Sequence, residues 1–98
     1  MRVLRKGRAV ITNLINVKAL AGTEKASRAA VIVGLKVHKR STKRNLIKRR
    51  LRAALQKFLP DFKAIVDVAI VAEPESVGRD QKSLAAALEY CLKKLEII

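Results

Sequence analysis

The sequence predicts a two-layer α/β (α+β) sandwich, in which two helices cover one face of a small mixed sheet. Two stretches, residues 28–38 and 65–72, are rich in alternating or β-branched apolar residues and are typical of strands. Between them, the segment from about Thr42 to Phe58 has the apolar spacing of a helix. A strand, a helix and a strand in this order favour a βαβ unit with parallel neighbouring strands.

A first strand, or a pair of short ones, is predicted within residues 10–20. Two sets of residues alternate there, the apolar set Ile15, Val17 and Ala19 and the mixed set Asn16, Lys18 and Leu20. This period of two indicates a half-buried strand. Residues 21–27 are expected to form a turn. Residues 1–8 are either the last turn of a helix or a disordered lead-in.

Residues 28–38 show the clearest alternation in the chain. Val31, Val33, Leu35 and Val37 are expected on one face, and Ile32, Gly34, Lys36 and His38 on the other. Gly34 would leave room above the sheet. If Asn16 and Lys18 point to the side of Lys36 and His38, the sheet has a polar, positively charged floor. The register between the strands decides this.

Two amphipathic helices complete the predicted fold. The first has Ser41 or Thr42 as its expected cap, stops at Pro60, and carries an apolar stripe of Ile47, Leu51, Ala54, Leu55 and Phe58. The second begins at the expected cap Asp80 and carries a stripe of Leu84, Leu88, Cys91, Leu92 and Leu95. The segment between Pro74 and Asp80 is expected to be a loop.

The charge of the chain is strongly uneven. Its net charge is +14, and residues 36–57 hold ten of the twenty-two Lys and Arg residues with no Asp or Glu. Up to Lys57, seventeen basic residues stand against Glu24 alone, whereas the remaining residues include five basic and seven acidic ones. A folded domain with this asymmetry presents a basic surface, for which nucleic acid is the commonest partner.

The side of the predicted basic helix that faces away from its apolar stripe gathers Asn45, Lys48, Arg49 and Arg52. A helix face that is merely solvated usually mixes both charge signs. Here, Lys43 and Arg44 also lie in the first turn, where cations oppose the helix dipole. A bound polyanion explains this arrangement better than solvation alone.

Other classes of function find little support. The chain has no Trp and no apolar run of about 18 residues, which argues against a membrane partner. Its single cysteine, Cys91, fits a reducing cytoplasm and is expected to be a small buried hydrophobe. Glu73 and Glu75 either share a divalent ion or are ordinary strand-end residues.

Catalytic groups and base-stacking aromatics are scarce. His38 is the only histidine, and it is either an exposed strand-end residue or an RNA contact. With only two Phe and one Tyr, the expected mode of binding is recognition of phosphates and shape, with strong dependence on salt. We therefore expect a binding protein without catalytic residues or metal ligands of its own.

Residues 42–52, TKRNLIKRRLR, resemble the signature of the bacterial ribonuclease P protein subunit, an Arg-Asn-Arg core followed by Lys-Arg and a further Arg. The matching positions are Arg44, Asn45, Lys48, Arg49 and Arg52. Residues 33–39 and 67–74 are similar to the flanking strands, and Gly7-Arg8 to the turn after the family's first helix. Leu46 replaces the second Arg of the core, the connection over residues 39–44 is shortened, and Leu4 stands at an aromatic position.

This resemblance implies a single RNA-binding domain over residues 1–98 with a shortened N-terminal helix. It also implies a fold like the second domain of ribosomal protein S5, with a left-handed crossover around the basic helix, against the general right-handed rule. The implied partners are the catalytic RNA of ribonuclease P and precursor tRNA, whose 5′ leader the holoenzyme removes as an endonuclease. Mg²⁺ would be held mainly by the RNA, and no protein partner would be required.

The resemblance also implies which residues bind RNA. The catalytic RNA would contact the matching positions together with Lys43, Arg40 and Lys39. The leader would lie in a cleft between the sheet and the first helix, where Lys36, His38, Lys18 and Asn16 are weaker candidates. Two alternatives stay open, a structural RNA-binding protein such as a small ribosomal protein, and an autonomous RNase.

Overall fold

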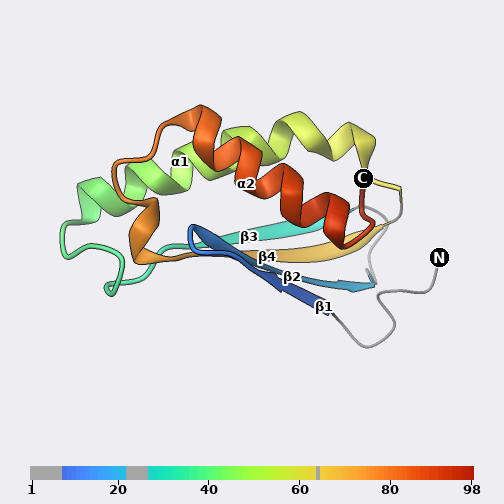
Figure 1. The fold of residues 1–98 in the computed structure, drawn as a ribbon, viewed down its shortest axis with the longest axis horizontal. Helices are drawn as coiled ribbons and strands as arrows, with labels where there is room; N and C mark the ends of the chain where they lie inside the picture. Colours follow the sequence, from blue (N-terminus) through green and yellow to red (C-terminus); the bar gives the residue numbers. More distant parts are fainter. Residues whose placement is uncertain (1–7, 22–26, 64) are drawn as a thin grey trace.

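Two helices lie side by side over one face of a four-stranded sheet in the computed structural model, which describes residues 8–21, 27–63 and 65–98 (Figure 1). In chain order the elements are β1 (Arg8–Ile11), β2 (Ile15–Ala21), β3 (Arg28–Ile32), α1 (Ser41–Phe58), β4 (Val66–Ala72) and α2 (Gln81–Lys94). Short 3-10 turns follow α1 at Leu59–Asp61 and β4 at Pro74–Ser76. The predicted two-layer α/β sandwich is confirmed.

The sheet is mixed, with the strand order β1-β2-β4-β3. β2 pairs antiparallel with both β1 and β4, whereas β3 pairs parallel with β4. The predicted βαβ unit is therefore present as β3-α1-β4, with its two strands adjacent. The left hand of this crossover stays a prediction.

Residues 10–20 form a pair of strands, because a tight connection separates β1 from β2. The amide and the hydroxyl of Thr12 both donate hydrogen bonds to the carbonyl oxygen of Ile15, over 3.0 and 2.6 Å. The amide of Ile15 donates back to the Thr12 hydroxyl. Thr12 thus closes the hairpin that aligns Arg8 with Ala19 and Ile11 with Asn16.

The strand predicted over residues 28–38 is too long, because β3 ends at Ile32. The parallel ladder stops at the pair Ile32–Val71, and β4 itself ends one residue later. Beyond that point an extended chain would have no backbone partner in the sheet. The chain turns instead, and the Val37 amide donates a hydrogen bond to the Gly34 carbonyl oxygen over 3.0 Å. Lys36 and His38 consequently lie in a connection and not on a strand.

The core lies between the sheet and the helices. The predicted stripes of both helices are buried there, with Phe58 at the end of α1 half-buried. The inward side chains of the two central strands are also buried, namely Ile15, Val17, Ala19, Val66, Val68, Ile70 and Ala72. Both described helices lie on the same side of the sheet, and no described helix covers the opposite, open face (Figure 1).

The helix ends differ in how they are capped. Asp80 caps α2 as predicted, since its carboxylate accepts a hydrogen bond of 2.8 Å from the Ser83 amide. The expected caps of α1 are wrong, because the capping position is Arg40 and no side chain caps the helix. The expectations for residues 1–7 and for the turn over residues 22–26 lie outside the described residues. No described helix is long and apolar enough to cross a membrane.

Candidate nucleic-acid interface

One exposed side of α1 forms a shallow hollow of about 450 Å³. It is lined by Thr42, Asn45, Lys48, Arg49 and Arg52. These positions recur every three or four residues, a spacing that places them on one side of a helix. The structure therefore brings together the four residues that the sequence places opposite the apolar stripe. The same helix fixes their direction, because its other side is buried in the core.

The cations of this hollow have no acidic partner in the part of the chain that the structure describes. α1 contains no Asp or Glu. Three ion pairs occur among the described residues, and all lie outside α1: Arg28–Asp67, Lys36–Glu73 and Lys93–Glu89. Clustered cations repel one another, and phosphates are the anions that relieve such repulsion in nucleic-acid complexes.

A side chain of α1 holds in place the segment that leads into this helix. The guanidinium of Arg44 donates hydrogen bonds to the carbonyl oxygens of His38 and Lys39, over 2.9 and 2.8 Å. The Nδ1 atom of His38 accepts a hydrogen bond from the Arg40 amide. Arg44 and His38 thus order the approach to the helix. Lys39, Arg40 and Lys43 are exposed around this end of α1.

A second basic residue of α1 joins the helices. The side chain of Arg50 donates a hydrogen bond to the carbonyl oxygen of Arg79, in the loop before α2. In return, the side chain of Gln81 donates to the Arg50 carbonyl oxygen over 2.9 Å. These contacts set the start of α2 against the middle of α1, so the basic hollow lies on a braced helix.

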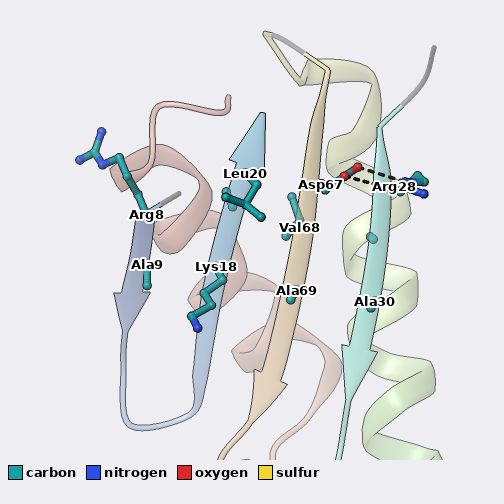
Figure 2. A pocket seen from close by; sticks show the side chains of 11 residues that line it. Arg8, Ala9, Lys18, Leu20, Arg28, Ala30, Asp67, Val68 and Ala69 are labelled. Atoms are coloured by element: carbon teal, nitrogen blue, oxygen red, sulfur yellow. Dashed lines mark hydrogen bonds and ion pairs between the residues drawn. The ribbon is translucent and has the colours of Figure 1, made fainter. Parts of the chain in front are cut away.

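The open face of the sheet contains a larger hollow, of about 640 Å³ (Figure 2). Its central row consists of small residues around one cation, because the register places Ala9 beside Lys18, Lys18 beside Ala69, and Ala69 beside Ala30. Lys18 is exposed on this floor. Leu20 also lines the hollow, and Arg8 borders it on the edge strand β1 with its side chain directed away from the floor (Figure 2).

One end of this hollow is closed by an ion pair. Arg28 on β3 donates two hydrogen bonds to the carboxylate of Asp67 on β4, over 3.2 and 2.8 Å (Figure 2). The hydrogen bond from Arg28 lowers the pKa of Asp67, and the same contact raises the pKa of Arg28. Arg28 is thereby held at the rim of the hollow.

Just beyond the other end of β4, Glu73 contacts two of the residues that are predicted to bind the leader. The Nδ2 group of Asn16 donates a hydrogen bond to Glu73, and the Nζ atom of Lys36 lies 3.4 Å from the same carboxylate. Lys36 and Asn16 thus meet through Glu73, while His38 lies at the start of α1. The charged floor is therefore only partly as predicted, since Lys18 and Asn16 share the open face but Lys36 and His38 are not on a strand.

The comparison with protein families decides the assignment. A family model described as Ribonuclease P matches residues 1–96. The chain belongs to this family. The ribonuclease P protein component of Synechocystis sp. is 35% identical over 72 residues, which make up 74% of this chain and 58% of that relative. The chain thus spans less than two thirds of the length of this curated relative.

Solved structures of RNase P proteins share the fold. A Staphylococcus aureus RNase P protein mutant with defective mRNA degradation activity superposes with a TM-score of 0.84 at 22% identity, covering 99% of this chain and 81% of the other. The RNase P protein of Thermotoga maritima gives a TM-score of 0.77 at 18% identity, covering 98% and 87%. At these identities the two structures show a common fold.

Two residues at the open sheet face, Arg28 and Asp67, were not identified from the sequence. The alternation of residues 28–38 contained a usable signal, because Arg28 and Ala30 share the face assigned to Ile32. Asp67 showed no such signal, since its role depends on the parallel register with β3. The interpretation of Cys91 as a small buried hydrophobe is confirmed, because its thiol is buried and burial raises its pKa to about 11.

Proposed function

We propose that this chain is the protein subunit of ribonuclease P, part of an endoribonuclease holoenzyme that removes the 5′ leader of precursor tRNA. The observation that carries the proposal is the acid-free hollow on α1, at the residues that match the family motif. Residues 1–98 would act as a single RNA-binding domain in the cytoplasm, with no further protein partner.

The α1 hollow is the proposed site for the catalytic RNA. Lys48, Arg49 and Arg52 present cationic donors within two helical turns, a spacing that suits successive phosphates of a folded RNA. Asn45 adds an amide that can donate and accept. The exposed Lys39, Arg40 and Lys43 extend this positive surface past the helix end, and Arg44 keeps their connection in place.

The open sheet face is the proposed site for the leader. Its floor of Ala9, Ala30 and Ala69 admits flat groups close to the sheet, and Lys18 places a cation among them. Arg28 stands at its rim, paired with Asp67. Binding of this kind relies on phosphates and shape, since no aromatic side chain lines the hollow among the described residues.

The chemistry of cleavage is assigned to the RNA. Among the described residues, no group of three or more His, Cys, Asp or Glu side chains gathers as a metal ion would require. We propose that Mg²⁺ is held mainly by the RNA, as the family resemblance implies. The protein's part is to neutralise phosphates that would otherwise repel one another.

The decisive experiment is cleavage of precursor tRNA by a bacterial-type ribonuclease P RNA at low magnesium, with and without this chain. The expected result is stimulated cleavage at the mature 5′ end. Tight RNA binding without stimulation would favour a structural RNA-binding protein, such as a small ribosomal protein. Cleavage by the protein in the absence of that RNA would indicate an autonomous RNase.

A further inference from the structure

Glu73 is an acidic residue that contacts Asn16 and Lys36, two of the residues predicted to bind the leader. It follows the end of β4, and its backbone amide donates a hydrogen bond of 2.9 Å to the carbonyl oxygen of Leu14. Its own carbonyl oxygen accepts from both the amide and the hydroxyl of the buried Ser76. The backbone of Glu73 is therefore tied to the β1–β2 connection and to the turn after β4, so its side chain projects from a defined point.

The carboxylate of Glu73 engages donors from two other segments. One oxygen accepts from the Nδ2 group of Asn16 on β2, and the other lies 3.4 Å from the Nζ atom of Lys36, in the connection to α1. The Glu73 side chain is 22% exposed. Only the Nδ2 group of an asparagine can donate to a carboxylate, so this contact sets the direction of the amide. The Oδ1 atom of Asn16 is left buried, without a hydrogen-bond partner among the described residues.

The side-chain amide of Asn16 and the ammonium of Lys36 are donors of the kind that contact the phosphates of a nucleic acid. An amide and an ammonium converging on two oxygens form the arrangement that binds a phosphate. Glu73 supplies the two anionic oxygens from within the protein. An approaching phosphate would have to displace this carboxylate, and would be repelled by it at the same time.

We propose that Glu73 acts as an internal phosphate mimic that withholds Lys36 and Asn16 from the leader and so limits leader affinity at this end of the sheet. The inference rests on the proposed function, because it assumes that the leader crosses the open face. The phosphates of the leader are then confined to the part of the face around Lys18, away from the end of β4.

The test compares the wild type with Glu73→Gln in the reconstituted holoenzyme. This substitution removes the charge but keeps a side-chain oxygen that accepts from Asn16. Dissociation constants are measured over a range of salt for two precursor tRNAs, one with a single-nucleotide leader and one with a leader long enough to cross the sheet. We expect the long-leader precursor to bind about two- to fivefold more tightly, the size of one exposed charge interaction. The slope of log K against log salt should steepen by roughly 0.7, as for one added single-strand phosphate contact.

Two control variants assign the effect to its cause. Glu89→Gln removes the same charge from α2, where Glu89 pairs with Lys93, and should not change the preference between the two leaders. Adding Lys36→Met to Glu73→Gln should abolish the gain in affinity for the long-leader precursor, because Lys36 is the cation that Glu73→Gln releases. Glu73→Ala repeats the test without the side-chain amide that glutamine introduces. Thermal melts followed by circular dichroism check that each variant is folded.

The outcomes separate this inference from the function on which it rests. An unchanged or weaker affinity of both Glu73 variants for the long-leader precursor would overturn the inference, provided that the wild type distinguishes the two leaders. An equal gain in Glu89→Gln would overturn it as well, because the effect would then come from net charge. If the wild type does not distinguish the leaders, the proposed leader site itself fails, and the inference fails with it.

Discussion

Lys48 and Arg52 lie one helical turn apart on α1 and line the same hollow. Like charges at this spacing destabilise an isolated helix by about 0.2–0.5 kcal/mol. The free protein therefore carries a small repulsion at this surface, which a phosphate placed between the two side chains would turn into attraction. This relationship makes α1 the first target for substitution.

Replacing Lys48, Arg49 and Arg52 together by Ala should weaken binding to a bacterial-type ribonuclease P RNA. The loss of three phosphate contacts should flatten the salt dependence by roughly two to three units in log K against log salt. The fold should persist, because Ala favours helices and all three side chains lie outside the core. Filter binding over a range of salt measures both the affinity and the slope.

A matched variant removes the same charge elsewhere. Lys82, Lys93 and Lys94 are exposed on α2, outside the α1 hollow. Their joint replacement by Ala should leave most of the affinity intact. If the two triple variants lose affinity equally, binding depends on net charge alone and the assignment of α1 is wrong.

Replacing Ala30 by Phe should obstruct the sheet hollow. Ala30 lies opposite Ala69 in the row of small residues, on the open side of the sheet (Figure 2). A bulky ring there fills space that a leader would use and leaves the core untouched, so affinity should fall for long-leader precursor tRNA and not for the ribonuclease P RNA. Ala86→Phe, at an exposed alanine of α2, is the control. Equal effects of both variants would argue against leader binding on the sheet.

The helices could be predicted from the sequence because their evidence is local. The spacing of Ile47, Leu51 and Leu55 defines the buried side of α1, and Asn45 and Arg52 must then lie on the other side. No information from elsewhere in the chain is needed. The Asp80 cap is predictable for the same reason, since its partner Ser83 is three residues away.

The sheet face could not be predicted in the same way, because its contacts join distant segments. Asn16 meets Glu73 across 57 positions and Arg28 meets Asp67 across 39. Both contacts follow from strand order and register, which a period of two leaves undetermined. The same limit produced the error at residues 33–38, where apolar alternation continues although β4 has ended.

Asp80 should make the stability of the protein depend on pH. The Ser83 amide lowers the pKa of this carboxylate through its hydrogen bond, and nearby Arg50 and Lys82 lower it further. A carboxyl whose pKa is lowered by folding stabilises the native state above its unfolded pKa, and this stabilisation is lost as the pH falls through the folded pKa. Asp80→Ala should therefore lower the Tm at neutral pH, and the difference from wild type should shrink in acid.

The matched variant for this cap is Asp80→Asn, whose side-chain oxygen still accepts from the Ser83 amide. Its Tm difference from Asp80→Ala should be nearly independent of pH, because the group that titrates is gone in both variants. Thermal melts followed by circular dichroism over an acidic pH series supply the values. A constant difference between wild type and Asp80→Ala across the series would contradict the role given to ionised Asp80.

Leu51 and Leu35 provide a test of the corrected strand boundary. Leu51 is fully buried between α1 and the sheet, whereas Leu35, predicted on a buried strand face, is 73% exposed in the turn after β3. Leu51→Ala should reduce the free energy of unfolding by about 2–5 kcal/mol, because it removes buried methyl groups and leaves a cavity. Leu35→Ala should change it by less than about 0.5 kcal/mol, as expected for an exposed side chain. Urea unfolding measures both, and a large loss for Leu35→Ala would restore the longer strand.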